Sequence, residues 1–214
     1  MAREAEAQAY RAVGRVNIAG SRFCTGTLIE PRLVLTAAHC LYNPRSGRRV
    51  PLTMLRFVAG LRLGRYAAVR GVTAAAAPDG YRYGRAVDRR SVGSDVALLV
   101  LDAADALEEA APLPVGGRLN GATPFALVSY ARDRAHAPSI ERRCPVRAAR
   151  GAVSAIGCEV TFGASGAPVI AEAPDGGRVV AIVSAMGRDG AGRPVALAVD
   201  VRPRLGELRA KLGI

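Results

Sequence analysis

Three short segments of this sequence carry the residue types of nucleophilic acyl transfer. His39 follows the apolar run LVLTAA, Asp95 stands before the apolar run at 96–101, and Ser165 lies in the glycine-rich segment GASGAP. A serine hydroxyl is a weak nucleophile at neutral pH, so it needs a neighbouring base, and that base needs a partner that fixes its tautomer. Histidine and a half-buried carboxylate are suited to these two tasks. The three residues are therefore candidates for one catalytic triad.

Other residues of the same types are weaker candidates. The chain has only two histidines, and His136 lies in a polar, proline-flanked stretch at 134–138 that is typical of an ordinary loop. Asp102, at the far end of the apolar run, is expected to mark the exit of a strand. Asp95 has one alternative role, as a cap at the start of that strand.

The order of the three candidates distinguishes two classes of serine hydrolase. In α/β-hydrolases the nucleophile turn reads G-x-S-x-G, and the histidine comes after the serine in the chain. Here residue 167 is alanine and no histidine follows Ser165. The order histidine, aspartate, serine is that of the chymotrypsin template.

From about residue 12 to residue 212, the sequence resembles the chymotrypsin/trypsin family of serine endopeptidases. Residues 24–29 (CTGTLI) and 36–40 (TAAHC) match the histidine signature of the family, including both cysteines. The resemblance implies an all-β fold, with two six-stranded Greek-key β-barrels, a triad in the cleft between them and a C-terminal α-helix. It also implies an acyl-enzyme, with an oxyanion hole formed by the backbone N–H groups of Gly163 and Ser165. This chemistry requires no metal or organic cofactor.

Four cysteines in a domain of this family are expected to form two disulfides, Cys24 with Cys40 and Cys144 with Cys158. A zinc site is the competing explanation, but the chain has no paired, short-spaced Cys/His ligand motif. Because disulfides persist in oxidising compartments, we expect a secreted or periplasmic protein whose signal peptide has been removed. No stretch approaches the roughly 18 to 20 apolar residues that span a bilayer.

The resemblance also suggests which residues contact the substrate. In the family, the residue six before the nucleophile lies at the floor of the specificity pocket, and here it is Glu159. A carboxylate there would favour arginine or lysine at the cleavage site; alternatively, Glu159 points to solvent beside Cys158. Met186 stands where glycine is common, so its side chain would partly fill the pocket entrance. The expected substrate-binding residues are Glu159, Val160, Ser184, Ala185, Met186 and Val195.

Two positions near the nucleophile depart from the family pattern. Trypsin-like enzymes usually carry an aspartate immediately before the serine, and in many of them it pairs with a freed N-terminus during activation. Ala164 cannot form that ion pair, and Ala167 replaces a glycine. Together with the heavy use of Ala, Arg and Gly, these changes indicate a bacterial branch that orders its pocket differently. A catalytically impaired binding module is the alternative.

The elements that must position these residues are short strands. Apolar and β-branched runs separated by turn signals predict two sets of six. They lie at 13–18, 26–29, 33–36, 55–58, 67–72 and 96–101, then at 125–130, 142–146, 152–156, 168–171, 179–184 and 195–199. Leucines at 205, 208 and 212 predict a terminal helix.

This pattern predicts a division of the chain into two domains. We expect an N-terminal barrel over 10–108 that carries His39 and Asp95, and a C-terminal barrel over 122–201 that carries Ser165. A linker over 109–121 joins them, after a helical turn at 103–110, and the helix occupies 202–214.

The chain is strongly basic. Its formal net charge is +12, and arginine carries nearly all of it because Lys211 is the only lysine. A solvated basic surface is the simplest explanation; a field that attracts an anionic surface or an acidic substrate is the alternative. No nucleic-acid-binding motif is recognisable. We expect a soluble monomer that acts on polypeptides.

Overall fold

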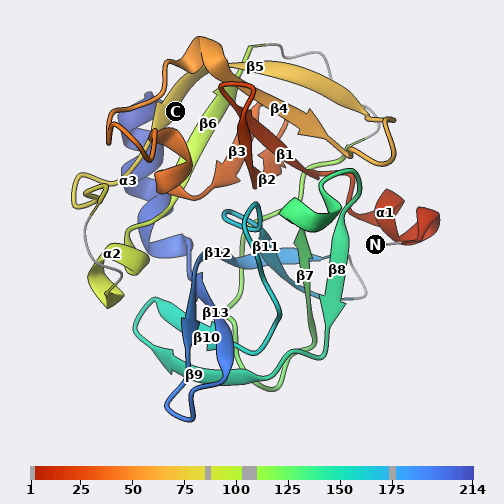
Figure 1. The fold of residues 1–214 in the computed structure, drawn as a ribbon, viewed down its shortest axis with the longest axis vertical. Coiled ribbons are helices and arrows are strands. Elements are labelled where there is room, and N and C mark those ends of the chain that lie inside the picture. Colours follow the sequence, from red (N-terminus) through yellow and green to blue (C-terminus); the bar gives the residue numbers. More distant parts are fainter. Residues whose placement is uncertain (1–2, 85–87, 103–109, 174–176) are drawn as a thin grey trace.

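The computed structural model describes residues 3–84, 88–102, 110–173 and 177–214 of the chain. Strands dominate the described part, and they form two bodies that lie one above the other in Figure 1. The all-β class with a C-terminal helix is therefore confirmed. The helical turn expected at 103–110 falls almost entirely outside the described residues.

The first half of the chain closes into a six-stranded antiparallel barrel with the strand order β1-β2-β3-β6-β5-β4. Its inward side chains are the apolar residues of the predicted runs, and Phe57, Leu35 and Leu98 are fully buried there. The strands are β1 (Val13–Ile18), β2 (Arg22–Glu30), β3 (Leu33–Thr36), β4 (Leu55–Ala59), β5 (Ala68–Ala76) and β6 (Ala97–Leu101).

The second half forms a seven-stranded sheet with the order β8-β7-β11-β12-β13-β10-β9. It has one strand more than the six expected, because two separate strands occupy the region around the third cysteine. The strands are β7 (Phe125–Ser129), β8 (Ser139–Arg142), β9 (Val146–Arg150), β10 (Val153–Ile156), β11 (Pro168–Ala171), β12 (Arg178–Arg188) and β13 (Pro194–Val199).

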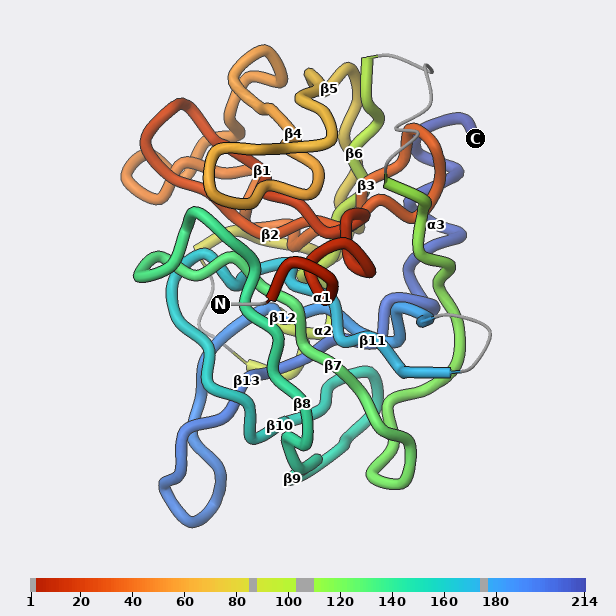
Figure 2. Tube along the Cα trace, turned by 90° about the vertical axis from the view of Figure 1, so that its right-hand side faces the viewer, coloured from red at the N-terminus to blue at the C-terminus, as the bar shows by residue number. Residues whose placement is uncertain are grey.

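The described residues also form three α-helices, which are α1 (Glu4–Ala9), α2 (Arg89–Gly93) and α3 (Arg202–Leu212). The terminal helix α3 follows the second sheet but packs on β5 and β6 of the first barrel, where Leu208 is fully buried. Figure 2 shows α3 running alongside both bodies. Within the described ranges, no helix has the length and apolar character needed to cross a membrane.

Most predicted strands lie where the sequence pattern placed them, with one clear exception. The strand expected at 142–146 is wrong, because β8 ends at Arg142, β9 begins at Val146 and residues 143–145 connect them. Arg143 adopts a left-handed backbone with φ 63°, and Pro145 has no N–H for a strand ladder. Both features end the pairing of β8 and start a new edge strand.

Candidate active site

Strand β3 delivers His39 to the site. Its four residues are all buried, and a 3₁₀ turn at Ala38–Leu41 follows it directly. Cys40 in this turn forms a disulfide with Cys24 on β2, so β3 and the disulfide together fix the position of the histidine.

The second expected disulfide, Cys144 with Cys158, is also present. Disulfide sulfurs are not thiolates, so the cysteines near His39 and near Glu141 offer no metal site.

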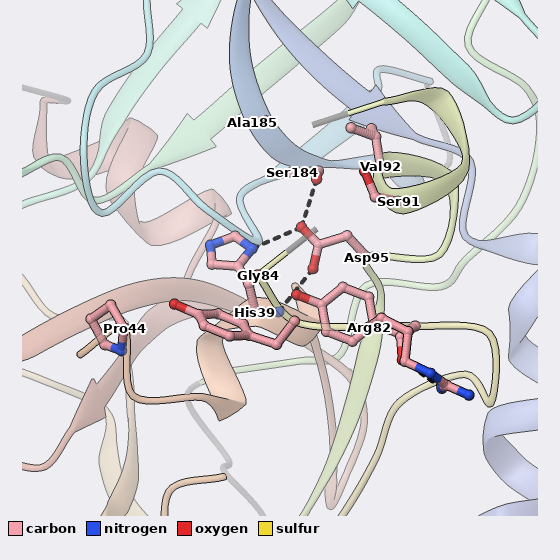
Figure 3. A pocket seen from close by; sticks show the side chains of 11 residues that line it. His39, Pro44, Arg82, Gly84, Ser91, Val92, Asp95, Ser184 and Ala185 are labelled. Atoms are coloured by element: carbon pink, nitrogen blue, oxygen red, sulfur yellow. Dashed lines mark hydrogen bonds and ion pairs between the residues drawn. The ribbon is translucent and has the colours of Figure 1, made fainter. Parts of the chain in front are cut away.

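Asp95 is bonded to His39 through both of its carboxylate oxygens. Oδ2 lies 2.7 Å from His39 Nδ1, and Oδ1 accepts the His39 backbone N–H at 2.8 Å (Figure 3). The Ser184 hydroxyl donates to Oδ2 at 2.6 Å. Asp95 is only 5% exposed, and these three donors offset the cost of burying its charge. The bond to Nδ1 leaves Nε2 as the imidazole atom that can accept a proton.

Ser165 lies in a tight turn before β11, and this turn lies against β2 and against the end of β3, the strand that precedes the histidine. Gly166 has φ 80°, and a Cβ there would lie 2.4 Å from Thr36 Oγ1 and 3.0 Å from Ala37 N. Gly163 has φ 97°, and a Cβ there would lie 2.4 Å from a carbon of the Phe23 ring. Both glycines therefore allow an approach of the turn to the first barrel that a side chain would prevent.

The turn leaves two amides available. Among the described residues, neither the Gly163 nor the Ser165 N–H donates to a protein acceptor, and no hydrogen bond joins Ser165 Oγ to His39. The structure thus joins His39 to Asp95 directly. It places Ser165 on a turn packed against the end of β3, which leads to His39.

A cavity of about 420 Å³ opens beside the histidine, lined by Tyr81, Tyr83 and Ala185 together with His39 and Asp95 (Figure 3). The ring of Tyr83 stacks on Tyr42 with centroids 5.0 Å apart, which joins the two loops that form one wall. Burial and the nearby Asp95 charge raise the pKa of Tyr81, so its phenol stays neutral. The sequence pattern gave no indication of this wall, since these tyrosines lie in two irregular segments.

The other expected substrate residues have different surroundings. Ser184 is buried with its hydroxyl on Asp95, Ala185 lines the cavity, and Met186 is exposed at the surface. Val160 is half-buried against the second core, and Val195 is buried.

Glu159 is exposed, and its backbone N–H donates to Glu141 Oε2 at 2.9 Å. The exposure favours the alternative in which its carboxylate points to solvent. Burial, and to a lesser extent the charge of Glu159, raise the pKa of Glu141.

Two residues near the site were not found by sequence reasoning. Phe162, three positions before the nucleophile, is 67% exposed, and its carbonyl accepts the backbone N–H of Arg132 at 2.7 Å. Thr25, next to the disulfide cysteine, is fully buried and bonded to the nucleophile turn. His136 is exposed, and its carbonyl accepts the N–H of Leu63.

Comparison with known proteins places this fold and site in a family. The family described as "Trypsin-like peptidase domain" matches residues 24–182. No curated protein matches the chain. A Glu endopeptidase solved in complex with MPD shares the fold, with a TM-score of 0.75 and 16% identity over 96% of this chain and 92% of that one.

A second solved structure has the same architecture. The thermostable serine protease AL20, from an extremophilic microorganism, aligns with a TM-score of 0.71 and 15% identity, over 90% of this chain and 92% of that one. The family match runs from the first disulfide cysteine into β12 and covers more than half of the sequence. The chain belongs to the trypsin-like peptidases and is a serine endopeptidase.

Proposed function

We propose that this protease cleaves polypeptides through a triad of His39, Asp95 and Ser165 and a covalent acyl-enzyme. The observation that carries the proposal is the buried Asp95 carboxylate, which is bonded to both the ring and the backbone of His39. That arrangement fixes the orientation and tautomer of the imidazole, which is the task of the acid in a triad.

The proposed reaction has two stages. Ser165 Oγ attacks the carbonyl carbon of the peptide bond while its proton passes to His39 Nε2. The negative charge that forms on the carbonyl oxygen is stabilised by the N–H groups of Gly163 and Ser165. His39 then returns the proton to the departing amine, which leaves an ester on Ser165. A water molecule, deprotonated by His39, hydrolyses that ester and regenerates the serine.

Basic residues near the cavity support an attraction for acidic polypeptide segments. Arg45 and Arg48 are exposed on the loop at 43–49, whose Pro44 lines the cavity, and residues 41–50 contain no acid. Arg82 lines the cavity from the opposite loop. A cleft rimmed by one sign of charge concentrates ligands of the other sign. We include acidic stretches near the cleaved bond in the proposed substrate class.

Two disulfides support a secreted or periplasmic location. Disulfides form and persist in oxidising compartments and are rare in the cytosol, and together the two pairs account for all four cysteines.

The direct test is hydrolysis of an unstructured protein such as casein by the wild type and by Ser165→Ala. We expect cleavage by the wild type and none by the variant at the same concentration. A folded wild type that cleaves neither casein nor any peptide of a mixed library would instead support the impaired binding module.

A further inference from the structure

The backbone conformation of the nucleophile turn must be fixed by contacts with other residues. The residue before the serine is Ala164, which is 1% exposed and has no charge to pair. Two amides that have no acceptor among the described residues, those of Gly163 and Ser165, nevertheless lie in this turn. A peptide group is planar, with its N–H and its C=O on opposite sides. A hydrogen bond to the carbonyl of one residue therefore fixes the direction of the N–H of the next residue.

Three carbonyls of the turn accept hydrogen bonds from residues outside it. The Phe162 carbonyl accepts the N–H of Arg132 at 2.7 Å, which orients the peptide that bears the Gly163 N–H. Thr25 holds the next carbonyls: its Oγ1 donates to Gly163 O at 2.9 Å, and its N–H donates to Ser165 O at 2.8 Å. Thr25 therefore holds the peptide that follows Gly163 and the peptide that follows Ser165, next to the two peptides that bear the unpaired N–H groups. The peptide that bears the Ser165 N–H is also held by its own carbonyl, since Ala164 O accepts the N–H of Ala167 at 2.9 Å.

Thr25 is itself rigidly placed in the first barrel. It lies in β2, fully buried, directly after the cysteine bonded to Cys40. Its hydroxyl accepts the N–H of Tyr130 at 3.0 Å, and its carbonyl accepts the Thr36 hydroxyl at 2.8 Å. Thr36 ends the strand that leads to His39. Thr25 is thus hydrogen-bonded both to the strand that leads to His39 and to the nucleophile turn in the other half of the molecule.

We propose that Thr25 is a positioning residue that sets the oxyanion-binding amides of Gly163 and Ser165, in place of a charged contact at Ala164. The inference rests on the proposed function, because it assigns those amides to the oxyanion. Rotation of the peptides around Gly163 would turn its N–H away from the substrate, and the Thr25 hydroxyl opposes that rotation. The contribution is made in the transition state, so it acts on kcat rather than KM.

The chain offers a matched control on the same strand. Thr27 lies two residues on, on the same face of β2, and is also fully buried, yet its hydroxyl has no hydrogen-bond partner within the described part of the protein. Thr25→Val and Thr27→Val remove the same atom from equally buried sites. Thr25→Ser keeps the hydroxyl that the proposal requires.

We expect Thr25→Val to lower kcat by about 10- to 100-fold, with KM changed by less than about threefold. Thr25→Ser and Thr27→Val are expected to keep kcat within about threefold of the wild type. A peptide aldehyde, whose adduct with Ser165 carries an oxyanion, should bind Thr25→Val more weakly by a similar factor. The matching peptide alcohol, which forms no adduct, should bind all four proteins alike. If the role of Thr25 were purely structural, Thr25→Val would weaken the binding of the aldehyde and of the alcohol by the same factor.

Equal kcat losses in Thr25→Val and Thr27→Val, or equal losses of aldehyde and alcohol binding, would overturn the role of Thr25. If Thr25→Val does not fold, Thr25→Ala replaces it against Thr25→Ser, since these two differ only in the hydroxyl. Failure of every hydroxyl-free variant to fold would mean that Thr25 is needed for folding, and the proposal would be wrong. An inactive wild type refutes the proposed function itself, whereas an active wild type with unaffected Thr25 variants refutes only this inference.

Discussion

The most constrained side chain of the site is Asp95, which accepts three hydrogen bonds while almost fully buried. Asp95→Asn keeps its size but presents an amide to the imidazole, which stabilises the wrong tautomer. We expect kcat to fall by about 10⁴-fold with little change in KM. Steady-state kinetics on a peptide substrate measure this, and the melting temperature provides the control for folding. A loss below about tenfold would show that Asp95 does not orient His39 during the reaction.

Glu141 is expected to lower the stability of the protein as the pH rises. Its pKa is raised above the ordinary value of 4.5, first by burial and then by the charge of Glu159, although the Glu159 N–H opposes the shift. A raised pKa in the folded state means that the stability linked to the neutral acid is present below that ordinary value. This stability is lost as the pH rises through the folded-state pKa.

Glu141→Gln removes this loss and keeps an oxygen that accepts the Glu159 N–H. We expect the free energy of unfolding of the variant, relative to the wild type, to increase from about pH 4 to about pH 7. Urea unfolding at several pH values measures it. A difference that stays constant or shrinks as the pH rises would be inconsistent with the shift.

At the scale of elements, the approach of the nucleophile turn to the first barrel depends on Gly166. A Cβ at this position would lie 2.3 Å from Thr25 O and 2.4 Å from Thr36 Oγ1, and its φ is 80°. Gly192 is a matched control, with φ 76° and no atom within 4 Å of its Cβ. Gly192→Ala should cost only the strain of the left-handed backbone, about 1–2 kcal/mol.

Gly166→Ala adds the clash to the same strain, so it should be less stable than Gly192→Ala by at least about 1–3 kcal/mol. It should also lose most of its peptidase activity, because the turn must move away from β2 and β3. Urea unfolding and peptide hydrolysis of the two variants decide the matter. Equal stability would mean that the turn is not tightly packed.

Prediction from sequence succeeded for elements whose signals are local. The runs at 13–18, 33–36 and 168–171 are strands with the predicted bounds, because short apolar, β-branched runs and nearby turn residues define them. The break after β8 was missed, because nothing in the pattern revealed that Arg143 adopts a left-handed backbone. Contacts across the chain were also missed. Ser184 and Asp95 are 89 residues apart, and Thr25 and Gly163 are 138 residues apart, so no periodicity connects them.

At the scale of the whole molecule, the proposed attraction for acidic polypeptides depends on where the arginines lie and not only on the net charge of +12. Arg45→Gln with Arg48→Gln, the rim variant, removes two exposed charges from the loop at 43–49, whose Pro44 lines the cavity. Arg147→Gln with Arg150→Gln removes two exposed charges from the edge strand β9, at the far end of the second sheet (Figure 1). Both double variants change the net charge equally.

At low salt we expect the rim variant to lower kcat/KM for an acidic peptide by about three- to tenfold, and the β9 variant to change it little. Because salt screens exposed charges, the difference should diminish at high ionic strength. Neutral peptides serve as the control substrate. An equal effect of the two double variants would assign the attraction to net charge alone, and the rim would have no special role.

The central claim is that Ser165 is a nucleophile activated by His39. Labelling of the folded protein with a fluorophosphonate, followed by mass spectrometry of its peptides, tests this most directly. The account predicts a single adduct on Ser165 that disappears in His39→Ala and in the unfolded wild type. The absence of an adduct on folded wild-type protein, or equal labelling of His39→Ala, would contradict it.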